Sequence, residues 1–260
     1  MRDAVVESNV KYLNPYYEDF EQEFTRKGKK RKENKQKASN GLELKTFHPL
    51  NQNQKSVYGL FDDGYNLVLS GCAGTGKTFL SLYLSLQEIL SKRSEAKRII
   101  IVRSVVPSRD MGFLPGSITE KSKVYETPYS AMCSDFFSRG DAYQILKTKK
   151  LIEFTTTSFV RGQTWDNAII IVDEFQNLSW QELHSVITRT GEGSRIIFSG
   201  DGNQDDLTSE RYSQESGIRK FSGVLSKLDS FRFVKFEPED IVRSGVVREY
   251  LEVCHSLNYC

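Results

Sequence analysis

The chain has 260 residues, of which 38% are hydrophobic, and this is enough for one α/β domain of ordinary size with some length left for a tail. No apolar run approaches the roughly 20 residues that span a bilayer, and the first residues carry acidic side chains instead of the apolar stretch of a signal peptide. The four cysteines form no C-x-x-C pair, and their spacing suggests neither a zinc site nor a disulfide framework. A reduced, cytoplasmic protein without a membrane partner is therefore expected.

The net charge of +2 is unevenly distributed. Residues 26–37 hold eight basic residues and one acidic residue, whereas the rest of the chain holds 28 basic and 33 acidic residues, a net charge of −5. Such a segment buries too little apolar surface to fold, so we expect a disordered basic arm that either contacts nucleic acid or serves as a solubilising linker. We predict that residues 1–40 comprise this arm and an acidic, aromatic segment, and that residues 41–260 form one folded domain.

Within the predicted domain, short β-branched runs alternate with helical stretches, as is typical of a mainly parallel sheet with crossover helices on both faces. In chain order we expect a helix over residues 52–61, a strand over 66–70, a helix over 77–91, strands over 98–102, 151–155 and 168–172, a helix over 181–189, a strand over 195–199, a helix over 221–228, a strand over 231–236 and a helix over 240–255. Residues 107–150 are an insertion between two strands, and insertions of that length usually carry functional loops or partner surfaces.

Residues 71–78 (GCAGTGKT) match the phosphate-binding loop G-x-x-x-x-G-K-[ST]. They lie between a predicted strand and a predicted helix, as that motif requires, and a chance match is on the order of one percent, so a merely structural Gly-rich turn is a poor alternative. Lys77 is expected to reach the β- and γ-phosphates and the Thr78 hydroxyl to bind Mg²⁺. The predicted nucleotide-binding residues of the loop are Gly71, Cys72, Ala73, Gly74, Thr75, Gly76, Lys77 and Thr78, with no separate role for the Cys72 side chain.

An acidic pair follows the apolar strand over residues 168–172. We expect Asp173 to hold Mg²⁺ through a water and Glu174 to act as the base or orienter of an attacking water. After a phosphate-binding loop, we prefer this interpretation to the alternative of a solvated strand end. Gln204, in the segment GDGNQ after the next strand, is expected to hydrogen-bond the γ-phosphate, although this segment alone would be a plain turn.

The sequence favours ATP over GTP. GTPases need D-x-x-G after the magnesium-binding strand and N-K-x-D further on. Asp173 is followed by Glu-Phe-Gln, and the nearest imitation of the second motif begins with Ser226 inside a helical stretch.

Together these motifs resemble the first RecA-like half of a superfamily 1 helicase and, more narrowly, a phage-type member of the PhoH-like family. The resemblance runs from about residue 50 to residue 243. Ser104 and Cys72 stand where the family usually has proline. The resemblance is carried by the phosphate-binding loop and by LNQNQ at residues 50–54, Arg103, GFLPG at 112–116, EK at 120–121, PY at 128–129, RGQT at 161–164, DEFQN at 173–177, TRTG at 188–191, GDGNQ at 200–204 and DIVR at 240–243.

This resemblance implies a RecA-like P-loop fold, ATP hydrolysis and an activity on RNA or single-stranded DNA. It also implies that Gln54 reads the adenine edge. Since the chain ends where the second helicase lobe would begin, we expect subunits to assemble into a ring-shaped homo-oligomer. Arg243 would then supply catalytic charge to its own site, or Arg243 or Arg189 would do so in a neighbouring site.

Nucleic-acid contact is assigned to Arg103, Lys121 and Arg161, with a surface ion pair as an equal alternative for the last two. Three aromatic residues are candidates either for base stacking or for a local core, namely Phe113, Tyr129 and Trp165. Two other functions stay open: a nucleotide-gated switch with slow hydrolysis, and a P-loop kinase for small molecules. Glu174 argues against the switch, and the helicase-type Gln176 and Gln204 argue against the kinase.

Overall fold

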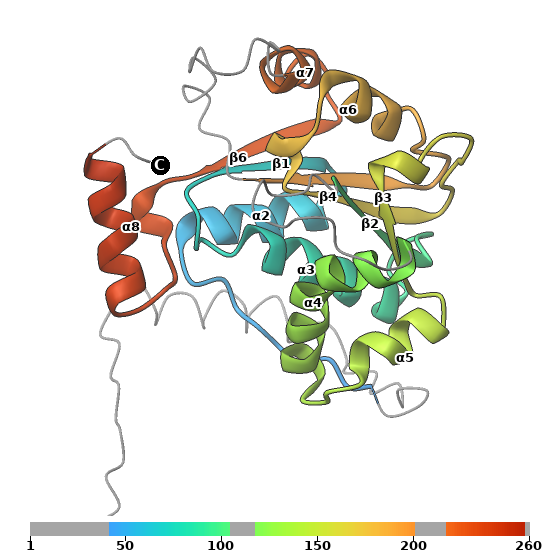
Figure 1. The fold of residues 1–260 in the computed structure, drawn as a ribbon, viewed down its shortest axis with the longest axis horizontal. Coiled ribbons are helices and arrows are strands. Elements are labelled where there is room, and N and C mark those ends of the chain that lie inside the picture. The colour runs from blue at the N-terminus through green and yellow to red at the C-terminus, as the bar shows by residue number, and fades with distance from the viewer. Residues whose placement is uncertain (1–41, 105–117, 201–216, 258–260) are drawn as a thin grey trace, which may run out of the picture. The chain divides into compact units, whose positions relative to one another are not determined.

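The computed structural model describes residues 42–104, 118–200 and 217–257, without the side chains of residues 118–123 and 219 (Figure 1). From Glu43 onward the described residues belong to one compact unit. Six strands form one sheet in the order β3-β2-β4-β5-β1-β6, and every neighbouring pair is parallel. The strands are β1 (Asn66–Gly71), β2 (Arg98–Arg103), β3 (Ile152–Thr156), β4 (Ala168–Asp173), β5 (Arg195–Ser199) and β6 (Phe231–Phe236).

Helices cover both faces of this sheet (Figure 1). Helices α2 (Gln52–Asp62), α3 (Lys77–Ser91), α4 (Ile118–Phe137) and α5 (Ala142–Thr148) lie on one face, and α6 (Trp180–Ile187) and α7 (Gly217–Leu225) lie on the other. Helix α8 (Val246–Ser256) lies beyond the end of β6. The predicted RecA-like α/β architecture is thus confirmed, and all six predicted strands agree with the structure to within one residue at each end.

Burial explains why the strands were predictable. All six residues of β4 are buried, because helices cover this central strand on both sides. Beneath α6 and α7, residues of the sheet and of both helices form a continuous apolar core that includes Ile170, Phe198 and Phe221. Val160 and Trp165, from the segment between β3 and β4, complete this core. Trp165 is 2% exposed, so of the two alternatives for this residue the local core is confirmed and base stacking is not.

The predicted helices agree less well with the structure. Helix α7 begins at Gly217 and ends at Leu225, four and three residues before its predicted limits of 221 and 228. The prediction of one helix over residues 240–255 is wrong at its start, because Pro238–Asp240 is a 3₁₀ turn and α8 begins only at Val246. Asp240 is buried and its Oδ2 accepts hydrogen bonds from Glu237 N and Asn53 Nδ2, so this carboxylate closes a turn instead of opening a helix.

The described part of the insertion is helical, which the sequence did not indicate. Helix α4 contains Pro128, a residue that usually ends helices. The side chain of Glu126 fixes α4 to α5, since it accepts hydrogen bonds from the Tyr143 hydroxyl at 2.8 Å and from Lys147 Nζ at 2.5 Å. Among the described residues, no helix has both the length and the apolar composition that crossing a membrane requires.

Candidate nucleotide-binding site

The phosphate-binding loop connects β1 to α3, at the carboxyl edge of the sheet. Gly74 and Gly76 have φ angles of 76° and 90°, a left-handed conformation that favours glycine. The Thr75 hydroxyl donates to the Cys72 carbonyl at 3.0 Å, and Cys72 N donates to the Phe236 carbonyl at 3.0 Å, which ties the loop to β6. The backbone therefore has the tight turn that a phosphate cradle needs, at the N-terminus of a helix.

Lys77 lies within this turn. Its side chain is 6% exposed, and its Nζ donates to the carbonyls of Gly71 at 2.8 Å and Cys72 at 2.7 Å. A buried ammonium requires such partners because losing hydration is costly. A phosphate group carries full negative charge and is a stronger acceptor than a carbonyl. The position of Lys77 at the mouth of the loop therefore fits a nucleotide phosphate.

Gln54 braces the loop from α2. The side chain is buried, its Nε2 donates to the Thr75 carbonyl at 3.0 Å, and its Oε1 accepts from Leu50 N at 2.8 Å. Asn51 caps the start of α2 by accepting from Gln54 N, which fixes the backbone of this residue as well. The structure thus places Gln54 against the loop, and its contact with adenine stays a prediction.

Thr78 and Asp173 are hydrogen-bonded to each other at the carboxyl edge of the sheet. Asp173 ends β4, which is separated from β1 by β5, and its Oδ1 accepts a hydrogen bond from Thr78 Oγ1 at 2.8 Å. The carboxylate is 2% exposed. Hydroxyl and carboxylate oxygens are the protein ligands that Mg²⁺ prefers, either directly or through its waters. The two side chains therefore fit the expected magnesium site beside the phosphate loop.

Two further side chains contact Asp173. The Tyr129 hydroxyl, from α4, donates to Asp173 Oδ2 at 2.7 Å, and Arg103 Nη1 lies 3.9 Å from the same oxygen. Burial and the Asp173 charge both raise the pKa of Tyr129. Burial lowers the pKa of Arg103, but the Tyr129 and Asp173 side chains outweigh that effect and raise it. Arg103, predicted to contact nucleic acid, thus lies beside Asp173. Tyr129 is 1% exposed, so of its two alternatives local packing holds and base stacking does not.

Glu174 adopts an unusual backbone conformation. Its φ of 52° is in the left-handed region, which is costly for a residue with a side chain and is often found at functional sites. Gln176 Nε2 donates to Glu174 Oε2 at 2.6 Å and thereby orients the carboxylate. The Gln176 Oε1 is buried without a hydrogen-bond partner among the described residues. A methyl group on Gly200 would lie 2.2 Å from this oxygen and would displace the Gln176 side chain.

Arg243 lies beside the phosphate loop of its own chain. Val242 N donates to the Gly74 carbonyl at 3.1 Å, and a methyl group on Gly74 would lie 3.0 Å from Arg243 Cγ. The Arg243 side chain is otherwise exposed. The segment after β6 therefore covers the loop and brings a cation to it.

Arg189 is not brought to the loop in the same chain. Its carbonyl accepts from Trp165 N at 2.8 Å, and Trp165 precedes the first residue of β4, so Arg189 lies near the amino edge of the sheet. The phosphate loop follows the last residue of β1 at the carboxyl edge. Because the strands are parallel, the two positions are at opposite edges of the sheet.

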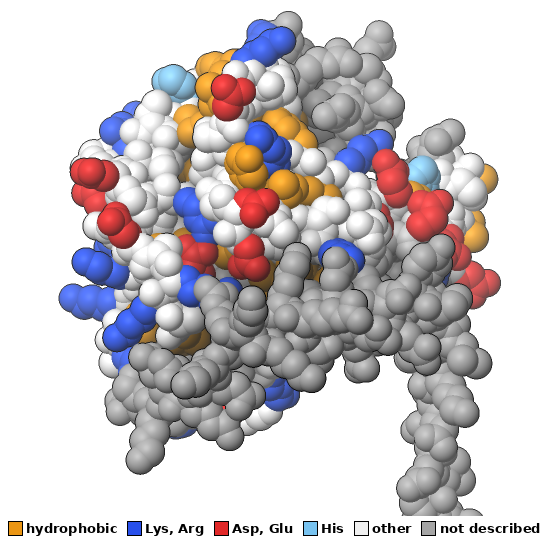
Figure 2. All heavy atoms as spheres, turned by 180° about the vertical axis from the view of Figure 1, so that it is seen from behind, with side chains coloured by type: hydrophobic (Ala, Val, Ile, Leu, Met, Phe, Trp, Pro, Cys, Tyr) orange, Lys and Arg blue, Asp and Glu red, His pale blue; other side chains and the backbone are white. Residues whose placement is uncertain are grey.

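The remaining predicted residues are described in part or not at all. Arg161 is exposed in the loop after β3. Lys121 belongs to α4, but its side chain is not among the described parts of the chain. Gln204 and Phe113 lie outside the described residues. On the face drawn in Figure 2, the Lys and Arg side chains of the described residues are scattered among acidic ones and form no continuous stripe.

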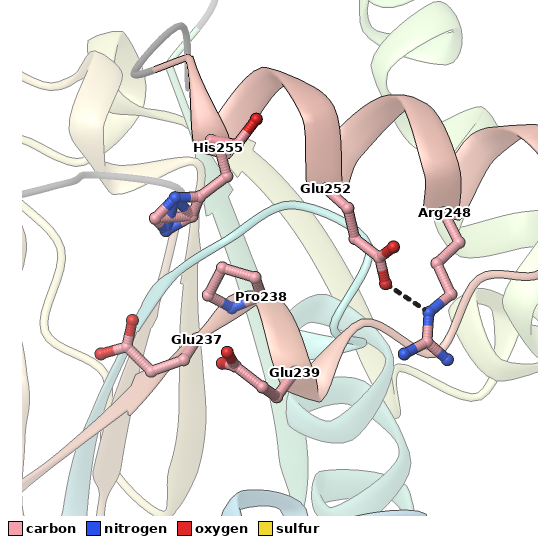
Figure 3. Close-up of a pocket in the computed structure, with 7 residues that line it drawn as sticks. Glu237, Pro238, Glu239, Arg248, Glu252 and His255 are labelled. Carbon is pink, nitrogen blue, oxygen red and sulfur yellow. Dashed lines mark hydrogen bonds and ion pairs between the residues drawn. The ribbon is translucent and has the colours of Figure 1, made fainter.

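A pocket lies between the turn after β6 and α8 (Figure 3). Glu237 and Glu239 come from the turn, and Glu252 and His255 come from α8, where Glu252 pairs with Arg248. None of these residues belongs to the phosphate loop. Among the described residues, no group of three or more His, Cys, Asp or Glu side chains is arranged to hold a metal ion.

The glycine-rich loop between β1 and α3, the buried Lys77 and the Thr78–Asp173 pair define a P-loop nucleotide-binding domain. The family model for PhoH-like proteins matches residues 46–255. The chain therefore belongs to the PhoH-like family.

Its relatives include the PhoH-like protein of Synechocystis sp., 34% identical over 183 residues, which cover 70% of this chain and 54% of the relative. Protein PhoH of Escherichia coli K12 is 32% identical over 190 residues, 70% of this chain and 51% of that protein. The chain thus spans about half the length of the curated relatives it matches. Among solved structures, it is similar to the UvsW helicase from bacteriophage T4, with 14% identity, a TM-score of 0.44 and coverage of 87% of this chain and 78% of that one.

Proposed function

We propose that this protein hydrolyses ATP with Mg²⁺ and couples hydrolysis to RNA or single-stranded DNA as a homo-oligomer. The observation that carries the ATPase proposal is the 2.8 Å hydrogen bond from Thr78 to Asp173, two residues 95 positions apart. It joins the phosphate loop to the acidic end of β4, where Glu174 follows directly. Membership in the PhoH-like family supports the same activity.

Each side chain has a distinct role in this proposal. Lys77 exchanges its carbonyl partners for the β- and γ-phosphates, and Thr78 with Asp173 holds Mg²⁺, which neutralises charge on those phosphates. Glu174, held by Gln176, orients the attacking water and accepts its proton. Arg243, beside Gly74, adds positive charge near the γ-phosphate. ATP is the proposed nucleotide because the sequence lacks the guanine-specific motifs.

Two substitutions test the hydrolysis proposal. Lys77→Ala should abolish turnover, because the γ-phosphate charge loses its partner. Glu174→Gln should keep ATP bound while turnover stops, since the amide cannot accept the proton. The measurements are phosphate release and ATP binding by equilibrium dialysis. Equal turnover in wild type and Glu174→Gln would remove Glu174 from the mechanism and favour a slow nucleotide-gated switch.

The nucleic-acid proposal is supported by the basic segment 26–37 and by the exposed Arg161. We expect poly-ribonucleotide or single-stranded DNA to stimulate phosphate release and Arg161→Ala to weaken that stimulation. Ser158→Ala, an exposed substitution in the same segment between β3 and β4, is the matched control. A turnover rate that no polynucleotide changes would refute the coupling while leaving the ATPase proposal intact.

The oligomer proposal is supported by the position of Arg189. This residue cannot serve its own phosphate loop from the opposite edge of the sheet, but a neighbouring subunit packed head to tail could receive it. Mixing Lys77→Ala protein with Arg189→Ala protein should restore part of the activity, because some interfaces then join an intact Lys77 to an intact Arg189. Mixing Lys77→Ala protein with Arg243→Ala protein tests in the same way whether Arg243 acts in a neighbouring subunit. Full activity of Arg189→Ala alone, or of a monomer, would refute this arrangement.

A further inference from the structure

We propose that Tyr129 is a positioning residue for Asp173, and that helix α4 of the insertion sets the Mg²⁺ affinity of the nucleotide site through it. This inference rests on the proposed Mg²⁺-dependent nucleotide binding. It assigns a role to a tyrosine whose sequence context indicated only base stacking or core packing.

The two oxygens of the Asp173 carboxylate have different partners. Oδ1 accepts from Thr78 at 2.8 Å, and Oδ2 accepts from the Tyr129 hydroxyl at 2.7 Å. The carboxylate is 2% exposed and Tyr129 is 1% exposed, so bulk water does not compete for either hydrogen bond. The Tyr129 hydroxyl, together with Arg103 Nη1 at 3.9 Å from Oδ2, therefore holds the carboxylate plane in the orientation that directs its other oxygen at Thr78. Partners of this kind fix the orientation of the groups that bind a metal or its waters.

Tyr129 cannot move independently of its helix. Its ring packs beside Phe154 of β3, with centroids 6.0 Å apart. Three residues earlier on α4, Glu126 is held by Tyr143 and Lys147 of α5. The contact between α4 and the carboxylate is thus one end of a continuous chain of contacts that starts in α5. Lys147 Nζ still holds Glu126 when the Tyr143 hydroxyl is removed, so loss of that hydroxyl should leave α4 in place, whereas loss of the Tyr129 hydroxyl breaks the one contact of this chain that reaches Asp173.

The test compares two substitutions that each remove one buried hydroxyl from the same helix pair. Tyr129→Phe removes the donor to Asp173 and keeps the ring contacts, whereas Tyr143→Phe removes a donor to Glu126. Mg²⁺ is titrated into each protein with a fluorescent ADP analogue, so that binding is read without turnover. We expect the half-saturating Mg²⁺ concentration to rise by about tenfold or more in Tyr129→Phe and to stay within about twofold of wild type in Tyr143→Phe.

A double substitution shows whether Tyr129 acts through Asp173. In an Asp173→Asn background, adding Tyr129→Phe should change the half-saturating Mg²⁺ concentration by less than about twofold, because the affected carboxylate is already gone. Metal-free thermal unfolding reports whether each variant is folded. An equal Mg²⁺ response in Tyr129→Phe and wild type, or an equal loss in both tyrosine variants, overturns this inference. A wild-type protein that binds ADP without regard to Mg²⁺ overturns the proposed function instead.

Discussion

Alanine at Gly74 should separate the backbone requirement of the phosphate loop from general stability. Gly74 has a φ of 76° and lies under the segment after β6, where a methyl group would be 3.0 Å from Arg243 Cγ and 3.2 Å from Leu251 Cδ1. Gly64 has a φ of 90°, and no atom of the described residues lies within 4 Å of an added methyl group. It precedes β1 at the other end of that strand. Gly64→Ala is therefore a matched control with the same type of backbone cost.

The magnitude follows from two opposing effects. A left-handed conformation costs a non-glycine residue about 1–2 kcal/mol. Alanine also restricts the unfolded chain, which offsets about 0.4–1 kcal/mol of that loss. Both variants should therefore lose roughly 1 kcal/mol of unfolding free energy, or about 2–4 °C in Tm for a domain of this size. The contacts of a methyl group at Gly74 add little to this loss of unfolding free energy, because the exposed Arg243 side chain can move by a few tenths of an ångström.

Nucleotide binding should distinguish the two variants. In Gly74→Ala the strain of the left-handed backbone acts on the loop that holds the phosphates, so we expect ADP affinity to fall about tenfold, equivalent to about 1.4 kcal/mol. Gly64→Ala should bind ADP as wild type does. Isothermal titration calorimetry and thermal unfolding measure the two quantities. Equal ADP affinities in the two variants would refute the assigned role of Gly74, and an unchanged Tm in Gly64→Ala would refute the strain argument.

Four further predictions follow from the described contacts and the charge pattern. Asp240→Ala should lower the unfolding free energy by about 1–3 kcal/mol, because it removes a buried acceptor from two donors; chemical denaturation measures this, and an unchanged midpoint would contradict it. Gly200→Ala should reduce phosphate release more than ADP affinity, since a methyl group there displaces the side chain that orients the catalytic carboxylate; equal losses in both would contradict it. Burial raises the pKa of Cys133 from 9.0 to about 12, so the native state holds this proton more tightly than the unfolded state does. The free energy of unfolding should therefore fall as the pH rises above 9, by up to about 1.4 kcal/mol per pH unit. Equal denaturation midpoints at pH 9 and pH 10 would contradict this prediction. Deleting residues 1–40 should leave basal ATPase intact and flatten the salt dependence of nucleic-acid binding, whose slope is about −0.7 per phosphate neutralised on single strands; an unchanged slope would show the segment to be a linker.

Local sequence patterns determined the positions of the strands and identified both Thr78 and Asp173 as site residues. Continuous apolar runs such as β4 occur because covered parallel strands are buried on both faces, and this property is visible without any partner strand. The phosphate loop was equally readable, because its glycines and Lys77 act within one turn of backbone. Both are short-range properties of the chain, so the sequence alone was sufficient for them.

Only the tertiary structure determined which distant side chains meet. The pairing of Arg103 and Tyr129 with Asp173 depends on strand order and on the packing of α4, which no local pattern encodes. The placement of Arg189 at the opposite edge of the sheet from the loop likewise follows from the direction of the strands. The sequence also did not determine where the last helix begins. The Asp240 carboxylate accepts a hydrogen bond from Asn53, and the two residues meet only after the chain has folded.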